Sequence, residues 1–344
     1  MIRSTLSRLA RPLTSRRRTR DKARGIRGDV AIPFDMFDEI RSVTDTRSAL
    51  KLAEIYHKGQ KKIWDGRSVM DDLKARHGAI DLPPEKREAL SRILAVLLWG
   101  ELAAWKISAD LALHLEPLEA KLAATSQTHD EARHFYVMYE YMSLLGDVPH
   151  ELGPASEALL KGTLETRDLT RKLMGMQMMI EPMALTLFQL LRKHEIEPIL
   201  CDLLTLYQRD EARHVALGVL HLPKLLTDMG RIEGAGLWMW QFQQFWAEFS
   251  LVRELEADLV TLGINPADVV RIGRGKQVRA NQMLIEELGE DLAVFDAFVR
   301  FFDGKSEWEF PTKCTRSQYP QRLANAIAAT SAGTGVVPRN LINA

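Results

Sequence analysis

Two identical pentapeptides carry residue types that bind metal ions. The string Asp-Glu-Ala-Arg-His occurs at residues 130–134 and again at residues 210–214. In each copy the glutamate and the histidine stand three residues apart, so an α-helix would place both side chains on one face. Carboxylate and imidazole groups together suit iron or manganese and disfavour metals that prefer thiolate ligands. The candidate ligands from the two copies are Glu131, His134, Glu211 and His214.

Two further glutamates stand at matching positions upstream of the two copies. Glu101 precedes Glu131 by 30 residues, and Glu181 precedes Glu211 by the same 30 residues. Both lie in apolar segments, where a carboxylate costs several kcal/mol unless it is paired, protonated or bound to metal. Two divalent cations would neutralise four such carboxylates, while the histidines supply neutral imidazole. We therefore predict one di-metal site that includes Glu101 and Glu181.

The aspartate and the arginine of each copy extend this prediction. A metal-binding histidine usually donates its other N–H to a carboxylate or a carbonyl. Asp130 and Asp210 could each orient the histidine of the opposite helix, and Arg133 and Arg213 could pair with those aspartates. Such a shell would explain why all five residues recur, whereas surface ion pairs at helical spacing would not require the matching glutamates upstream.

The segments around these residues predict helices. Hydrophobic residues make up 46% and charged residues 27% of the 344-residue chain, and no alternating β pattern of useful length occurs. We expect four core helices over about 84–111, 117–145, 154–194 and 197–221. Further helices are expected over about 46–62, over 233–262 and between 266 and 302. The sequence thus predicts an all-α four-helix bundle with additional N- and C-terminal helices, in which Pro182 kinks the third core helix.

The ends of the chain differ from its middle in composition. The first 27 residues carry ten Lys or Arg and one acid, Asp21. We expect a basic, disordered arm over 1–30, one helical domain over 31–303 with its metal-binding core at 84–222, and an extended or disordered tail over 304–344. The alternative interpretations of the first segment are a targeting peptide, an arm that contacts phosphate groups or a membrane surface, and an arm that recruits an acidic partner such as a carrier protein or a ferredoxin.

Composition also bears on partners and on cellular location. No run of about 18 apolar residues occurs, so we predict no membrane span. Lys+Arg and Asp+Glu both number 46, and this balance gives no reason to expect a nucleic-acid partner. Cys201 and Cys314 are far apart and form no CxxC motif, which indicates a reducing cytoplasm and argues against a disulfide framework or a thiolate metal site.

The ligand pattern resembles that of the ferritin-like di-iron carboxylate superfamily. The residues that carry the resemblance are Glu101, Glu131, His134, Glu181, Glu211 and His214. Gln127-Thr128 before the first copy is similar to the oxygen-activating branch, which includes multicomponent monooxygenase hydroxylases, ribonucleotide reductase small subunits and acyl-carrier-protein desaturases. The resemblance covers about residues 90–222. It is highly specific for the metal site and much less specific for the reaction.

The resemblance implies two iron ions (Fe2+/Fe3+), alternatively manganese, that react with O2. By analogy Glu101, Glu131 and His134 hold one iron. Glu181, Glu211 and His214 hold the other. It further implies an oxidase or oxygenase that hydroxylates, N-oxidises or desaturates a small organic substrate and takes electrons from an external ferredoxin or reductase, because nothing here resembles a flavin or NADH site. The alternatives are a ferroxidase or iron-binding protein without an organic substrate, and a dimanganese catalase.

Two departures from the family patterns narrow the choice of branch. Ribonucleotide reductase small subunits carry a radical tyrosine where this chain has Met138, and arylamine N-oxygenases of this pattern carry a third histidine where it has Tyr207. The helices outside the core could form a substrate cavity or, equally, a homodimer interface. Residues one helical turn from the ligands would suit an apolar or aromatic substrate. They are Ala104, Trp105, Gln127, Met138, Met178, Leu185, Phe188, Tyr207 and Gly218.

Overall fold

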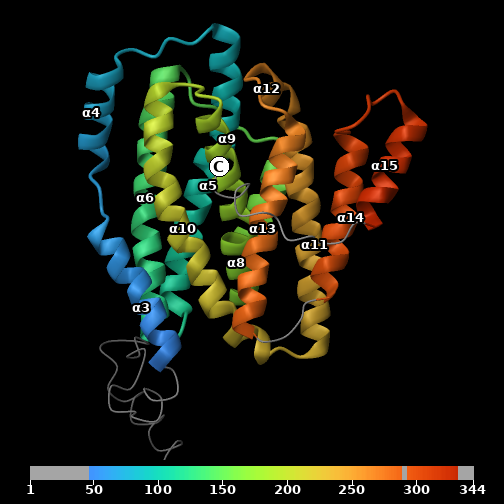
Figure 1. Cartoon of the computed structure of the whole chain (residues 1–344). Helices are drawn as coiled ribbons and strands as arrows, with labels where there is room; N and C mark the ends of the chain where they lie inside the picture. Colours follow the sequence, from blue (N-terminus) through green and yellow to red (C-terminus); the bar gives the residue numbers. More distant parts are fainter. Residues whose placement is uncertain (1–45, 289–292, 332–344) are drawn as a thin grey trace, which may run out of the picture.

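The computed structural model describes residues 46–288 and 293–331 (Figure 1). Within these two ranges every regular element is helical, which confirms the all-α prediction. The predicted basic arm over 1–30 lies outside the described residues. None of the described helices is both long and apolar enough to cross a membrane.

Four helical segments form the central bundle and carry all the predicted ligands. Their bounds are Pro84–His114 for α5, Leu118–Leu145 for α6, Leu169–Lys193 for the segment that joins α8, η1 and α9, and Pro198–Thr227 for α10. Figure 1 shows these segments side by side at the centre of the molecule. α5 begins at consecutive prolines with Glu85 in its first turn, a favourable start for a helix. α10 begins where the Glu197 side chain accepts hydrogen bonds from two backbone N–H groups.

The third core segment differs from the predicted continuous helix over 154–194. The chain forms α7 (Pro154–Leu164), leaves the helical path, and resumes as α8 (Leu169–Gly175). Asp168 caps α8 by accepting hydrogen bonds from two backbone N–H groups, and Thr166 accepts one from the Asp168 N–H. These local side-chain bonds compete with helix continuation. A turn of π-helix, η1 (Met176–Ile180), then joins α8 to α9 (Glu181–Lys193).

Further helices pack on both sides of this bundle. α3 (Thr46–Lys61) contacts α6 and α10, and α4 (Gly66–His77) follows it on the left of Figure 1. The Asp65-Gly66 turn signal marks the start of α4, because the Asp65 side chain caps this helix. α11 (Arg231–Glu254), α12 (Glu256–Thr261) and α13 (Pro266–Leu288) occupy the other side.

Two sequence-based helix ends are wrong. α10 continues through Pro223 to Thr227 instead of ending near residue 221. α14 (Ala293–Glu309) continues past residue 304, and α15 (Tyr319–Ser331) follows it, within a tail predicted to be extended or disordered from residue 304 onward. Gly304 explains the second error, because it lies inside α14 where a Cβ atom would stand 3.1 Å from a backbone oxygen of α15. This glycine allows two helices to pack closely and does not end one.

Candidate metal centre

The six predicted ligands meet in one buried cluster at the centre of the bundle. α5, α6, α9 and α10 contribute them, and each side chain is at most about 5% exposed. Their ligand atoms form two groups of four, and within a group all atoms lie within 4.8 Å of one another. The first group is Glu101, Glu131, His134 and Glu211. The second is Glu131, Glu181, Glu211 and His214. Glu131 and Glu211 belong to both groups, so each could bridge two ions.

Several polar atoms inside this cluster are buried without a hydrogen bond. Glu131 Oε2, His134 Nδ1 and Glu211 Oε1 are buried and make no hydrogen bond to any described residue. His134 Nδ1 lies 3.1 Å from Glu211 Oε1 and 3.6 Å from Glu131 Oε2 without hydrogen-bond geometry, and buried polar atoms are nearly always hydrogen-bonded, so three such atoms around one centre require an explanation. Carboxylate oxygens with imidazole nitrogens form a donor set that iron or manganese accepts. The residues present therefore fit a pair of such ions.

Each histidine turns one ring nitrogen toward the glutamates and the other toward an aspartate of the opposite copy. His134 Nδ1 lies 3.1 Å from a Glu211 oxygen, and His134 Nε2 lies 3.3 Å from Asp210 Oδ2. His214 Nδ1 lies 2.7 Å from Glu211 Oε2, and His214 Nε2 lies 3.5 Å from Asp130 Oδ2. An aspartate on the outer nitrogen leaves Nδ1 of each ring available to a metal.

The aspartates and arginines of the two copies form a closed ring of ion pairs. Arg133 Nη2 donates to Asp130 Oδ1 at 2.6 Å and to Asp210 Oδ2 at 2.9 Å. Arg213 Nη2 donates to Asp130 Oδ2 at 2.8 Å and lies 2.9 Å from Asp210 Oδ1. Two positive and two negative charges cancel within the ring, which is almost entirely buried. This ring, hereafter the Asp–Arg ring, joins both copies of the repeat on the outer side of the histidines.

Two aromatic residues make the surroundings of the histidines unequal. Tyr207 stacks on the His134 ring at 4.1 Å between centroids, and its hydroxyl donates to the His134 carbonyl at 2.6 Å. Trp64 Nε1 donates to Asp210 Oδ2 at 2.8 Å, and the Arg133 guanidinium lies over the Trp64 ring. Sequence reasoning missed Trp64, because it stands between α3 and α4 without any spacing signal that relates it to the repeat.

Gln127 of α6 holds two of the ligand carboxylates, and Gln177 of η1 supports it. Gln127 Nε2 donates to Glu131 Oε1 and to Glu181 Oε1, both at 3.0 Å. Gln177 Nε2 in turn donates to Gln127 Oε1 at 3.0 Å. Gln127, predicted to line a substrate pocket, thus contacts the candidate ligands directly.

The distortion expected at Pro182 lies just before it. The Glu181 N–H donates to the Met176 carbonyl five residues back, which is the hydrogen bond of a π-helix. Pro182 has no N–H to continue an α-helical pattern at this point. Turns of π-helix occur often at functional sites, and this one ends at a candidate ligand.

An apolar cavity reaches the cluster on the side of Glu101 and Glu181. It is partly open to solvent, has a cavity volume of about 40 Å³, and is lined by residues of α5, α7, η1, α9 and α11. Of the predicted pocket residues only Ala104 lines it. Trp105 is 38% exposed on the outside of α5, so its predicted position on the ligand face is wrong. Sequence reasoning missed Met176 and Met183, which line the cavity on either side of Glu181.

The remaining predicted pocket residues are elsewhere in the core. The set that does not line this cavity is Gln127, Met138, Met178, Leu185, Phe188, Tyr207 and Gly218. Met138 and Met178 are fully buried, whereas Leu185 is half-buried. A Cβ atom on Gly218 would stand 2.5 Å from the Gln177 Cβ, so this glycine allows α10 to approach η1 closely.

The pKa values of the candidate ligands are shifted in different directions. Burial raises the pKa of Glu101 and of Glu181 well above that of an ordinary glutamate. For Glu131 burial acts in the same direction, but the two histidines outweigh it and lower its pKa. Burial opposes charge on His134 and His214, yet the surrounding carboxylates outweigh it and raise the pKa of both well above the usual value. Without metal the cluster therefore balances its charge with protons.

We predict that binding of two divalent ions releases protons. They come from Glu101, Glu181, His134 and His214, because the pKa of each group is raised in the metal-free cluster. Affinity should therefore rise with pH. Calorimetric titration of metal-free protein with Mn2+, in buffers of different ionisation enthalpy, counts the protons released. The Glu131→Gln/Glu211→Gln variant is the control, and release of fewer than about one proton per chain by the wild type would contradict this charge assignment.

Comparisons with known proteins place the fold. No protein-family model and no curated protein matches this chain. The chain is similar to solved structures of R2-like ligand-binding oxidases. A tyrosine-to-phenylalanine variant with an aerobically reconstituted Mn/Fe cofactor has a TM-score of 0.52 at 16% identity, over 75% of this chain and 99% of that one. A glycine-to-leucine variant with an Fe/Fe cofactor gives the same values. This likeness shows that the chain has a ferritin-like helical fold.

Proposed function

We propose that this protein is a non-haem di-metal oxidase or oxygenase that uses O2 to oxidise a small apolar or aromatic organic substrate. The observation that carries the proposal is the pair of ligand groups that share Glu131 and Glu211 and lie beside an apolar cavity. Two irons are the proposed cofactor, with manganese as the alternative. The similar solved structures, whose cofactors are Mn/Fe and Fe/Fe, support this choice.

The chain's own residues would divide the work around these ions. Bound iron would supply the redox chemistry that activates O2. Glu131 and Glu211 would bridge, whereas Glu101 and Glu181 face the cavity and would be the carboxylates nearest the substrate. The Asp–Arg ring keeps both histidines in place from the outer side, and Gln127 fixes the oxygen of Glu181. The apolar cavity wall excludes water from the substrate side.

An outer cleft offers the route to the cavity. The cleft lies over α5 and α7, where Trp99, Lys106 and His150 line it. Leu160 of α7 lines both this cleft and the inner cavity, so its side chain stands between them. Beyond Leu160 the only charged side chains along the cavity are Glu101 and Glu181. Glu151 and Glu157 line the outer cleft, but the inner cavity is apolar up to the ligand glutamates. This inner part suits an apolar molecule better than a flow of hydrated iron ions, which favours an organic substrate over iron storage.

The proposal extends to partners and location. An external ferredoxin or reductase would supply the electrons, because the sequence has no likeness to a flavin or NADH site. Cys201 and Cys314 are both free thiols, which supports a reducing compartment such as the cytoplasm. A homodimer built on the outer helices also remains part of the proposal.

One experiment separates the proposed function from its alternatives. The metal-free protein is loaded anaerobically with two Fe(II) per chain and exposed to O2, with and without a panel of small aromatic and aliphatic compounds. We expect O2 uptake that a substrate accelerates, together with a product whose mass has gained one oxygen or lost two hydrogens. Continuous oxidation of many irons per chain would instead show a ferroxidase. Rapid H2O2 disproportionation by the manganese-loaded protein would show a catalase.

A further inference from the structure

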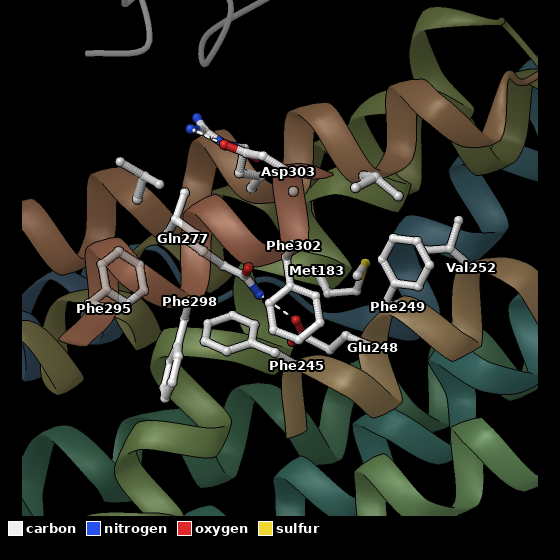
Figure 2. A pocket seen from close by; sticks show the side chains of 15 residues that line it. Met183, Phe245, Glu248, Phe249, Val252, Gln277, Phe295, Phe298, Phe302 and Asp303 are labelled. Carbon is white, nitrogen blue, oxygen red and sulfur yellow. Dashed lines mark hydrogen bonds and ion pairs between the residues drawn. The ribbon is translucent and has the colours of Figure 1, made fainter. Parts of the chain in front are cut away.

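A second cavity lies between α9, α11, α13 and α14, apart from the metal-ligand cluster (Figure 2). It is partly open to solvent and has a cavity volume of about 60 Å³. Five phenylalanine rings line it, and Figure 2 shows them around its interior. They are Phe245, Phe249, Phe295, Phe298 and Phe302. Neighbouring rings contact one another, with Phe302 at 5.7 Å from Phe245 and at 6.5 Å from Phe249 between centroids. The wall is thus apolar and aromatic.

One carboxyl group lies among these rings with half of its hydrogen-bonding capacity unused. Glu248 of α11 is only 3% exposed. Its Oε2 accepts a hydrogen bond from Gln277 Nε2 at 2.7 Å, whereas its Oε1 has no partner among the described residues. Figure 2 shows both side chains reaching the cavity between Phe245 and Phe302. A buried polar atom is rarely left unpaired, so the free oxygen indicates a ligand.

The charges around the cavity favour a neutral carboxylic acid at Glu248. The cation in the wall, Arg274, is held by two hydrogen bonds to Asp303, at 2.5 and 2.8 Å. Glu248 therefore has an amide as its partner and no cation. Burial raises the pKa of Glu248 to about 8 and the Gln277 hydrogen bond only partly offsets this, so the group is mainly protonated at neutral pH. Since Oε2 accepts from Gln277, the proton belongs on Oε1.

We propose that this cavity binds a neutral, apolar molecule with one hydrogen-bond acceptor, such as an aryl ketone, and that the O–H of Glu248 donates to this acceptor. The phenylalanine rings would enclose the apolar part. An anionic ligand would find no free cation, because Arg274 is committed to Asp303. A cationic ligand would require Glu248 to ionise in apolar surroundings. The site does not depend on the metal centre, although Met183 lines both cavities.

A matched pair of probes tests the hydrogen bond. Acetophenone and ethylbenzene have nearly the same shape and differ in the carbonyl oxygen. In calorimetric titrations of the full-length, metal-free protein, acetophenone should bind about tenfold more tightly, the contribution of one hydrogen bond. Glu248→Met should reduce this ratio to about one. Glu248→Gln should preserve it, because the amide can accept from Gln277 and donate to the ketone.

Further variants test the place and the charge of the ligand. Val299→Phe fills this cavity and should abolish acetophenone binding, whereas Ala184→Val, in the wall of the cavity at the metal cluster, should leave it unchanged. Circular dichroism and thermal melting identify any variant that fails to fold. The proposal is overturned if neither probe binds at millimolar concentration or if wild type binds both equally. The proposal would also be overturned if Glu248→Met kept the wild-type ratio of acetophenone to ethylbenzene affinity. Tighter binding of the cation 2-phenylethylamine than of acetophenone would overturn it as well, because it would show an ionised Glu248.

Discussion

Glu131→Gln and Glu211→Gln should each reduce the bound metal from two ions per chain to one or none. Each of these glutamates belongs to both ligand groups, so either substitution removes a carboxylate oxygen from both positions at once. Glu101→Gln and Glu181→Gln touch one group each and should remove one ion. For Glu131→Gln and Glu211→Gln we expect metal affinity to fall on the order of 100-fold or more. This loss exceeds the roughly 10–100-fold typical of substitutions at residues that only hydrogen-bond to a metal ligand.

Elemental analysis after anaerobic iron loading and desalting measures this effect directly. Glu119→Gln provides the matched control, since Glu119 lies on α6 with Glu131 but outside the cluster. The control should retain two ions per chain. Two tightly bound ions in the Glu131→Gln/Glu211→Gln double variant would show that the metal centre proposed above is wrong.

Asp210→Asn should destabilise the fold and weaken metal binding together. The substitution takes one of the two negative charges from the Asp–Arg ring and leaves two buried arginines with a single carboxylate. Loss of one partner from a buried ionic network typically costs about 3–5 kcal/mol. Asp210 also accepts from Trp64 and faces His134 Nε2, so metal affinity should fall about 10–100-fold as His134 loses its orientation.

Chemical denaturation of the metal-free protein and metal titration of the folded variant measure the two effects separately. Asp202→Asn is the control, because Asp202 lies on the same helix but forms only half-exposed pairs with Arg76 and His77. Such surface pairs are worth about 0–1 kcal/mol, so this variant should be nearly neutral. An equally small effect of Asp210→Asn would mean that the buried ring does not hold the cluster.

The contribution of the ring should also depend on pH with a definite sign. Burial raises the pKa of Asp130, but the contact with His214 and the charge of both histidines outweigh it and lower the pKa from 3.8 to about 2. A depressed folded pKa gives stability that is present above pH 4 and is lost as the pH falls toward 2. The ring therefore contributes its full stabilisation at neutral pH.

The repeat allowed prediction of the ligand cluster because its residues are fixed by helix geometry. Identical spacing on two helices places Glu131 with His134, and Glu211 with His214, on one face of each helix, and the apolar surroundings of Glu101 and Glu181 indicate that these faces are buried. The cavity was less predictable from the sequence. An α-helical period selects Met178 as a neighbour of Glu181, but the π-helical turn brings Met176 to the cavity instead.

Errors elsewhere arise where tertiary packing decides local structure. The residues after Leu164 are compatible with helix, yet the Asp168 side chain caps a new helix there and divides the predicted segment. Glycine is a residue type that often ends a helix, so the sequence predicts a helix end at Gly304. The close approach of α15 instead requires a glycine inside α14. The sequence around Trp64 does not predict a role near the metal cluster, because its contact with Asp210 joins residues 146 positions apart.

The π-helical turn before Glu181 also limits how this segment can change in length. A π turn arises when one residue is inserted into an α-helix without breaking it. Deletion of one residue from Met176–Ile180 would restore the α-helical register and rotate the upstream helix by about 100° relative to Glu181. Gln177 would then turn away from Gln127, and its hydrogen bond to the glutamine that donates to Glu131 and Glu181 would be lost. The segment should therefore accept substitutions more readily than single deletions.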